Sequence, residues 1–144
     1  MDEAGDYSAT GKAGETNMAT ARKERDFPSA DFEQFKKLRE RLRALEEERL
    51  EARRREAWEK AKRVAAMLKE RFSAERVILY GSLARGDFQE GSDIDLLVEG
   101  LRGSYWDMYV TAEECAAPFE VNVVCREDAR PALIEAAMKE GVLL

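Results

Sequence analysis

Residues 79–100 read LYGSLARGDFQEGSDIDLLVEG, and this stretch decides how the rest of the chain is interpreted. It connects two short apolar runs, residues 75–80 and 93–99, through a turn rich in glycine and serine. Runs of this kind bounded by such residues are typical of buried β-strands. Because strand side chains alternate between faces, Asp93 and Asp95 fall on one face of the second strand. A buried strand that begins with two like charges on one face is unusual and indicates a functional site.

The turn and the two aspartates have complementary chemistry. Gly81 permits a positive φ and a close backbone approach, and Ser82 supplies a hydroxyl and backbone amides, so the pair can hold an anion. Two carboxylates that converge on one point suit a hard divalent cation such as Mg²⁺, which bridges to substrate phosphates. Arg85 could add a counter-charge to those phosphates. Each feature alone is more often an ordinary turn or strand end, but together they predict a site for a metal and a triphosphate.

The elements around this block alternate between helix and strand. Apolar periodicity predicts a helix up to residue 72, two further helices at residues 105–117 and 127–141, and a third strand at residues 119–124. This alternation predicts an α/β fold, with a small mixed sheet of about three to four strands flanked by helices.

The first part of the chain has a different composition. Residues 1–28 have few large apolar side chains, and we expect a disordered tail there. Residues 29–56 form a charged helical extension before a folded domain at residues 57–144. The extension carries an apolar seam at heptad-like spacing, consisting of Phe32, Phe35, Leu38, Leu42 and Leu45. The seam favours another helix as its neighbour, which a partner protein or a second copy of the chain could supply. The alternative interpretation is a charged helix that is simply solvated.

Composition excludes several classes of function. The 144 residues contain no histidine, which excludes Ser-His-Asp and Cys-His nucleophile systems and His-ligated zinc. The two cysteines, Cys115 and Cys125, form no CxxC motif and support neither a zinc knuckle nor a disulfide framework. No run is long enough to span a bilayer and the start does not resemble a signal peptide, so we expect a cytoplasmic protein without membrane contact. Residues 76–144 carry 6 basic and 13 acidic residues, which argues against strong nucleic-acid binding.

A family resemblance follows from the same block. Gly81-Ser82, ten further residues and Asp93-Ile94-Asp95 resemble the GSx10DxD signature of DNA polymerase β-like nucleotidyltransferases, and GSLARG and SDIDLLV are most similar to the minimal nucleotidyltransferases. The resemblance implies that family's fold for residues 57–144, with Asp93 and Asp95 as Mg²⁺ ligands and catalytic residues. It also implies that Gly81 and Ser82 bind the phosphates of a nucleotide such as ATP, from which NMP passes to an acceptor hydroxyl.

One family position is different in this chain. The family pattern places a third carboxylate on the next central strand, where this sequence reads Val121-Asn122-Val123-Val124. Asn122 cannot act as a base, and it binds Mg²⁺ more weakly than a carboxylate would. Glu120 lies on the same strand face and is the candidate replacement as a catalytic residue, although an ordinary strand-edge charge is the alternative interpretation.

The resemblance also implies a partner. Minimal nucleotidyltransferases of this kind often act as antitoxins beside a HEPN-domain toxin, some by transferring AMP to a toxin tyrosine and others by binding alone. We therefore expect Mg²⁺-dependent transfer of AMP from ATP to a hydroxyl of a partner protein. The alternative is a catalytically degenerate antitoxin that neutralises its partner by complex formation only. A purely structural coiled-coil protein would leave the GSx10DxD block unexplained.

Overall fold

The structure is a computed structural model that describes residues 29–144, so the tail expected at residues 1–28 lies outside the described residues. The chain divides between Leu45 and Glu46 into two compact units, and each is described by itself. The elements are α3 (Ser29–Phe72), β1 (Arg76–Tyr80), α4 (Ser82–Arg85), β2 (Ile94–Glu99), α5 (Tyr105–Ala116), β3 (Val121–Cys125), the 3₁₀ turn η1 (Arg126–Asp128), α6 (Pro131–Glu140) and β4 (Val142–Leu143).

The second unit is built on a mixed four-stranded sheet with the order β3-β2-β1-β4. β1 pairs antiparallel with β2 and with β4, whereas β2 and β3 run parallel. The central strand β2 therefore has a neighbour on each side. In these registers Asp95 lies opposite Tyr80 of β1 and opposite Asn122 of β3. The small mixed sheet flanked by helices confirms the α/β fold predicted from the sequence.

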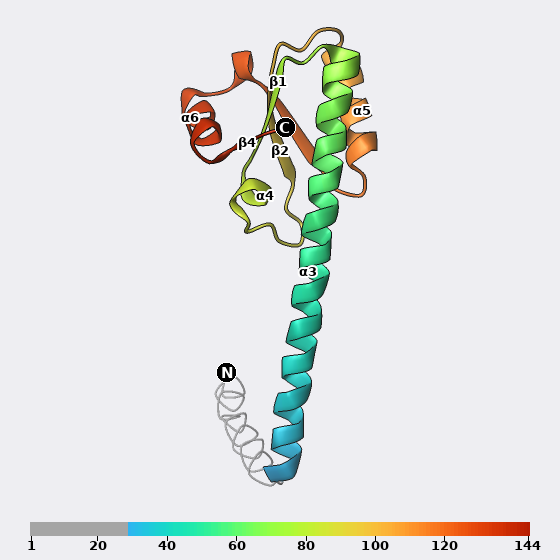
Figure 1. The fold of residues 1–144 in the computed structure, drawn as a ribbon, viewed down its shortest axis with the longest axis vertical. Helices are drawn as coiled ribbons and strands as arrows, with labels where there is room; N and C mark the ends of the chain where they lie inside the picture. The colour runs from blue at the N-terminus through green and yellow to red at the C-terminus, as the bar shows by residue number, and fades with distance from the viewer. Residues whose placement is uncertain (1–28) are drawn as a thin grey trace, which may run out of the picture. The chain divides into compact units, whose positions relative to one another are not determined.

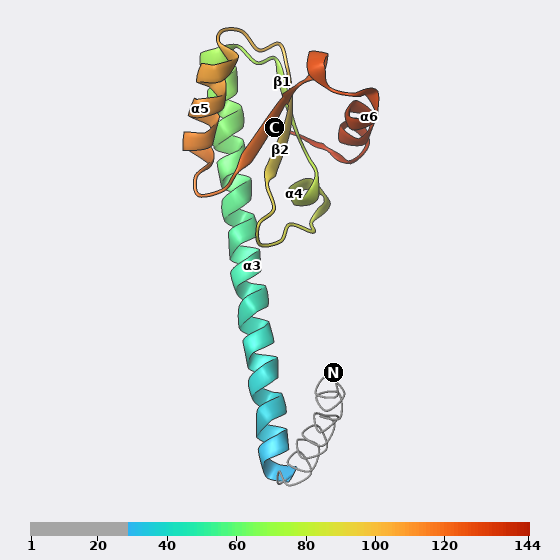
Figure 2. The same ribbon diagram turned by 180° about the vertical axis from the view of Figure 1, so that it is seen from behind.

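Helices cover both faces of the sheet. Residues 46–72 of α3 and the helix α5 lie side by side on one face, and α6 lies on the other, as Figures 1 and 2 show. The larger core lies under α3 and α5 and includes Ile94, Leu96 and Val98 of β2. The smaller cluster lies under α6 and includes Leu97. Since side chains alternate along β2, Asp93 and Asp95 lie with Leu97 on the α6 side. The sequence predicted that the two aspartates share a face.

α3 is long because its sequence contains nothing that interrupts a helix. No glycine or proline occurs between residues 31 and 72. The helix ends where Ser73 takes a positive φ of 58° and the backbone amide of Ala74 donates to the carbonyl oxygen of Leu68. Along residues 29–144, no helix combines the length and the apolar character that crossing a membrane requires.

The outer strands are short or partly covered. β4 has two residues, and the backbone amide of Leu144 extends its pairing by donating to the carbonyl oxygen of Val77. At the opposite edge, the hydroxyl of Tyr105 donates to the carbonyl oxygen of Val123 in β3, at 3.0 Å. Unpaired edge carbonyls invite pairing with another strand, so the contact of Tyr105 limits strand addition at the β3 edge, and the shortness of β4 limits it at the other edge.

The last helix and the last strand differ from the sequence-based expectation. The last helix begins at Pro131 instead of residue 127, because a residue before proline avoids helical backbone angles and Arg130 is extended (φ −70°, ψ 148°). Residues 126–128 form the separate 3₁₀ turn η1. The strand β4 was not predicted, since two residues are too few to show an alternating pattern.

Leu96 should contribute strongly to stability because it is fully buried in the middle of the central strand. We expect Leu96→Ala to lower the free energy of unfolding by about 3 kcal/mol, the usual cost of removing a buried leucine side chain. Leu143→Ala is the control: that side chain is 64% exposed in β4 and should cost less than about 0.5 kcal/mol. Urea denaturation followed by circular dichroism measures both, and equal losses would contradict this assignment of the core.

Candidate active site

Three polar side chains from two neighbouring strands meet on the α6 side of the sheet. Asp93 directly precedes β2, Asp95 is the second residue of β2, and Asn122 is the second residue of β3. The amide Nδ2 of Asn122 donates to Asp93 Oδ2 and to Asp95 Oδ1, each at 3.1 Å. The two carboxylates predicted from the sequence therefore converge on one point, and the amide of Asn122 bridges them.

The carboxylate of Asp95 is in an unfavourable electrostatic position. Partial burial is the main reason why its pKa lies above the ordinary value, and the charge of Asp93 raises the pKa further. The hydrogen bond from Asn122 and the positive charge of Arg85 act in the opposite direction. A divalent cation would compensate the two carboxylates better than a neutral amide does. The site offers two carboxylates and one amide, whose oxygen can rotate toward the carboxylates. All of these are oxygen ligands, which is the type that Mg²⁺ prefers.

Gly81 brings the backbone against these carboxylates. It follows β1 directly and has a φ of +80°, a region that side chains other than glycine rarely adopt. A Cβ at this position would overlap Asp95 Oδ2. Ser82 begins the short helix α4, which closes through the amide of Arg85 donating to the carbonyl oxygen of Gly81 at 3.0 Å. The Gly81-Ser82 turn therefore lies beside the aspartates, as the sequence predicted.

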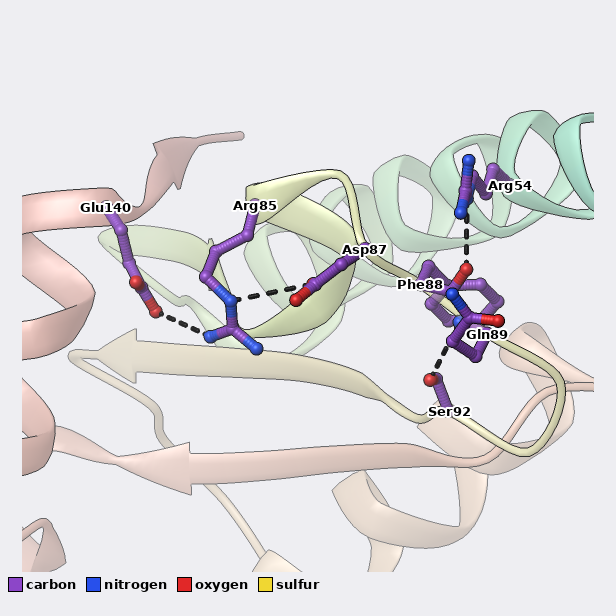
Figure 3. A network of polar contacts seen from close by, with 7 residues as sticks. All are labelled: Arg54, Arg85, Asp87, Phe88, Gln89, Ser92 and Glu140. Atoms are coloured by element: carbon purple, nitrogen blue, oxygen red, sulfur yellow. Dashed lines mark hydrogen bonds and ion pairs between the residues drawn. The ribbon is translucent and has the colours of Figure 1, made fainter.

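Arg85 is beside the site but is engaged elsewhere. Its Nη1 donates to Glu140 Oε1 of α6 at 3.1 Å, and its Nε lies 3.5 Å from Asp87 Oδ1 (Figure 3). Its charge nevertheless lowers the pKa of Asp95, so it is near enough to act on the site. To bind a phosphate, its guanidinium would exchange one of these two carboxylate partners for the phosphate oxygens.

The loop between α4 and Asp93 is anchored at Phe88. This ring is fully buried and packs edge-on against Phe119, with 5.9 Å between the ring centroids. The carbonyl oxygen of Phe88 accepts a hydrogen bond from Arg54 Nε at 3.0 Å (Figure 3). Next to it, the amide of Gln89 donates to Ser92 Oγ at 3.0 Å. These contacts fix the chain just before Asp93. The sequence did not reveal the contacts of Phe88 with Arg54 and Phe119 because they join segments far apart.

Glu120 is not gathered into the same cluster. It lies directly before β3, it is exposed, and its carbonyl oxygen accepts a hydrogen bond from the amide of Ile94 at 2.9 Å. Alternation with the buried Phe119 and Val121 places it on the same face as Asn122. Within residues 29–144, no group of three or more acidic, histidine or cysteine side chains has the geometry to hold a metal ion. A catalytic role for Glu120 stays a prediction.

The sequence analysis missed Tyr80. Its position opposite Asp95 in the β1–β2 register places it beside the carboxylates, and it also packs against the cluster under α6. Burial, with a smaller contribution from the charge of Asp95, raises the pKa of Tyr80 to about 12. The phenol therefore keeps its proton at neutral pH and can donate a hydrogen bond, but it cannot serve as a base. In the sequence, only its position directly before Gly81 indicated that Tyr80 is near the site. The strand register is what places it opposite Asp95.

The comparison with protein families agrees with this geometry. The family model described as "Nucleotidyltransferase domain" matches residues 61–144, which is more than half of the chain. The chain belongs to this nucleotidyltransferase family. The matched residues include the turn at Gly81, the strand with both aspartates and the strand with Asn122. A search among curated proteins found no relative.

Solved structures similar to this nucleotidyltransferase include two kinds of protein. A protein assigned as a minimal nucleotidyltransferase is 28% identical, with a TM-score of 0.50 over 58% of this chain and 88% of the other. A toxin–antitoxin crystallised with AMP-PNP is 19% identical, with a TM-score of 0.50 over 58% of this chain and 70% of the other. A complex of a tri-AMPylated HEPN toxin with an MNT antitoxin from Shewanella oneidensis is 16% identical, with a TM-score of 0.46, covering 60% and 70%.

Gly81 can be tested against a matched glycine. Gly81→Ala introduces both the strain of a positive φ and an overlap with Asp95 Oδ2. Gly91→Ala introduces the strain alone, because Gly91 has a similar φ (+83°) but open space where a Cβ would lie. We expect Gly91→Ala to cost about 1 kcal/mol of unfolding free energy and Gly81→Ala at least about twice that. Gly81→Ala should also weaken Mg²⁺–ATP binding at least about tenfold, measured by titration calorimetry. Equal effects of the two variants on binding would contradict the close approach of the turn to Asp95.

Asp95 should reduce the stability of this nucleotidyltransferase at neutral pH. Because folding raises the pKa of its carboxyl above the ordinary 3.8, its ionisation weakens the folded state once the pH exceeds both values. We expect Asp95→Asn to stabilise the metal-free protein by roughly 1 kcal/mol at pH 7, because an asparagine oxygen can still accept from Asn122. The advantage should disappear as the pH falls below 3.8, where the carboxyl is protonated in both states. Thermal melts at pH values between neutrality and 3.8 measure this difference in stability, with the exposed Asp128→Asn as control. A lower Tm for Asp95→Asn than for the unsubstituted protein at pH 7 would contradict the prediction.

Proposed function

We propose that this nucleotidyltransferase moves AMP from ATP to a hydroxyl of a partner protein and that it is the antitoxin of a HEPN-domain toxin. The observation that carries the proposal is the convergence of Asp93 and Asp95 beside the Gly81-Ser82 turn. The chain's membership of the nucleotidyltransferase family supports the reaction class.

The residues of the site would mainly position charge. Asp93 and Asp95 would hold Mg²⁺, which when bound supplies positive charge to the triphosphate. The Gly81-Ser82 turn would approach the phosphates with backbone amides and a hydroxyl, because no Cβ stands in the way. Asn122 would have to turn its amide so that its oxygen, in place of Nδ2, faces the metal. Arg85 would leave Glu140 or Asp87 and bind phosphate oxygens.

The transfer itself forms one bond and breaks another. The acceptor oxygen bonds to the α-phosphorus of ATP, the bond from that phosphorus to the β-phosphate oxygen breaks, and pyrophosphate leaves. The acceptor proton must go to a base. Asn122 cannot accept it, and Tyr80 already holds its own proton. We assign this role to Glu120, the exposed carboxylate on the same strand face.

The choice of nucleotide and partner rests on similarity. The sequence motif resembles those of minimal nucleotidyltransferases that act as antitoxins. The toxin–antitoxin of similar fold was crystallised with AMP-PNP, an analogue of ATP, so ATP is the first nucleotide to test. The absence of a nucleic-acid-binding charge pattern in residues 76–144 also favours a protein acceptor over a nucleic-acid acceptor.

A second candidate function has its own supporting observation. Asn122 stands where the family pattern has a carboxylate, and its amide is hydrogen-bonded to both aspartates, which reduces their repulsion without a metal. A site stabilised in this way could persist after activity has been lost. The protein would then be a degenerate antitoxin that neutralises the toxin by occupying its surface.

Intact-mass spectrometry separates the two functions. The protein is incubated with Mg²⁺, ATP and the product of a neighbouring gene as the candidate partner, and transfer of one AMP should add about 329 Da to that partner. Asp93→Asn/Asp95→Asn should abolish the adduct, whereas the matched control Asp107→Asn/Asp128→Asn, both outside the site, should not. A stable complex without any adduct would reject the transferase and favour the binding antitoxin.

Two further variants test how the site would function without the third carboxylate. Glu120→Gln should lower the transfer rate at least about tenfold if Glu120 accepts the proton. Asn122→Asp should tighten Mg²⁺ binding and raise the transfer rate, because it adds a negative oxygen ligand between the two aspartates. An unchanged rate in Glu120→Gln would remove that residue from the mechanism.

A further inference from the structure

The described part of the first unit, residues 31–45, presents the apolar seam to solvent. The five side chains of the seam are between 52% and 59% exposed, and none belongs to a core cluster of residues 31–144. These are Phe32, Phe35, Leu38, Leu42 and Leu45. A continuous apolar stripe on an otherwise charged helix is costly in water, so a neighbouring helix that covers it would stabilise it.

The spacing of the seam is that of a coiled coil. Phe35 and Leu42 are seven residues apart and take position a of the heptad, while Leu38 and Leu45 take position d. The next a position is Arg49, so the seam provides four core layers in two heptads. Arg39 lies over the ring of Phe35, with 5.9 Å from its guanidinium carbon to the ring centroid, and thereby shields the flank of this layer.

We propose that a second copy of this chain covers the seam, in a parallel two-stranded coiled coil. In a parallel pair, each g position faces the e position five residues later on the other helix. Arg41 is at g and Glu46 is at e, so the dimer contains two Arg41–Glu46 pairs of opposite charge. No like-charged g–e pair accompanies these four layers, since Gln34 faces Arg39.

The same charges disfavour an antiparallel pair. An antiparallel arrangement that matches all four layers pairs Phe35 with Leu45 and Leu38 with Leu42. It places Arg39 against Arg39 and Arg41 against Arg41 of the other copy, so like charges meet beside the central layers. Shifting one helix by a heptad would relieve this repulsion but would leave half of the layers uncovered.

The chain's own N-terminal residues are poorly suited to cover the seam. Residues 1–28 contain only four large apolar residues, Met1, Tyr7, Met18 and Phe27. They are six to eleven positions apart, whereas the seam has a member every three or four residues. Self-association through the seam does not depend on the proposed transfer activity.

Sedimentation equilibrium of the full chain tests the proposal. Four layers make a short coiled coil, so we expect reversible dimerisation, at twice the 16.4 kDa of one chain, with a dissociation constant on the order of 10–100 μM. Leu42→Glu should weaken it at least about tenfold. Ala44→Glu is the matched control on the same helix turn, because position 44 lies outside the seam and should change the constant by less than about twofold. A chain that stays monomeric at protein concentrations of about 10–100 μM, or that dimerises equally well with Leu42→Glu, would overturn the proposal.

A charge exchange tests the orientation. Arg41→Glu turns both Arg41–Glu46 pairs into repulsive ones and should weaken the dimer roughly fivefold, and Arg41→Glu/Glu46→Arg should restore it to within about twofold. Disulfide trapping gives an independent result: Leu38→Cys alone should form a 38–38 linked dimer, confirmed by peptide mapping. Preferential 38–42 linkage in a mixture of Leu38→Cys and Leu42→Cys chains would show an antiparallel pair and overturn the proposed orientation.

Discussion

The repulsion between Asp93 and Asp95 is the constraint on which the candidate site depends. Both carboxylates lie on one face of the central strand, and partial burial makes the charge of Asp95 more costly still. β2 can carry this pair because its opposite face is anchored by fully buried apolar side chains. Around the pair, the missing Cβ of Gly81 leaves room for Asp95, and the amide of Asn122 holds both carboxylates.

Asn122 is the residue on which the two candidate functions differ. As a hydrogen-bond donor it stabilises the aspartates in the absence of a metal, and as a neutral ligand it attracts a cation less than a carboxylate would. Asn122 therefore stabilises the two aspartates by itself, and it would hold a divalent cation less strongly than a carboxylate at the same position would. A trade-off of this kind is common at active sites, where groups arranged for function are seldom arranged for stability.

Local patterns were sufficient to predict the centre of the fold. The alternation in residues 93–99 predicted β2 and the shared face of its aspartates, and the glycine after the apolar run predicted the turn at Gly81. Contacts that depend on strand register or on distant segments could not be predicted this way. The position of Tyr80 beside Asp95 and the bond from Arg85 to Glu140, 55 residues away, are two examples. β4 was missed because two residues carry no periodicity.

Tyr105 has a consequence beyond the local hydrogen bond to Val123. By occupying a carbonyl of the outer strand β3, it reduces the capacity of the sheet to recruit an extended peptide at that edge, and the other edge ends in a strand of two residues. β-augmentation, in which a ligand adds a strand to a sheet, is therefore a poor route for complex formation. Recognition of a binding partner by this protein should depend on side chains presented by helices and loops.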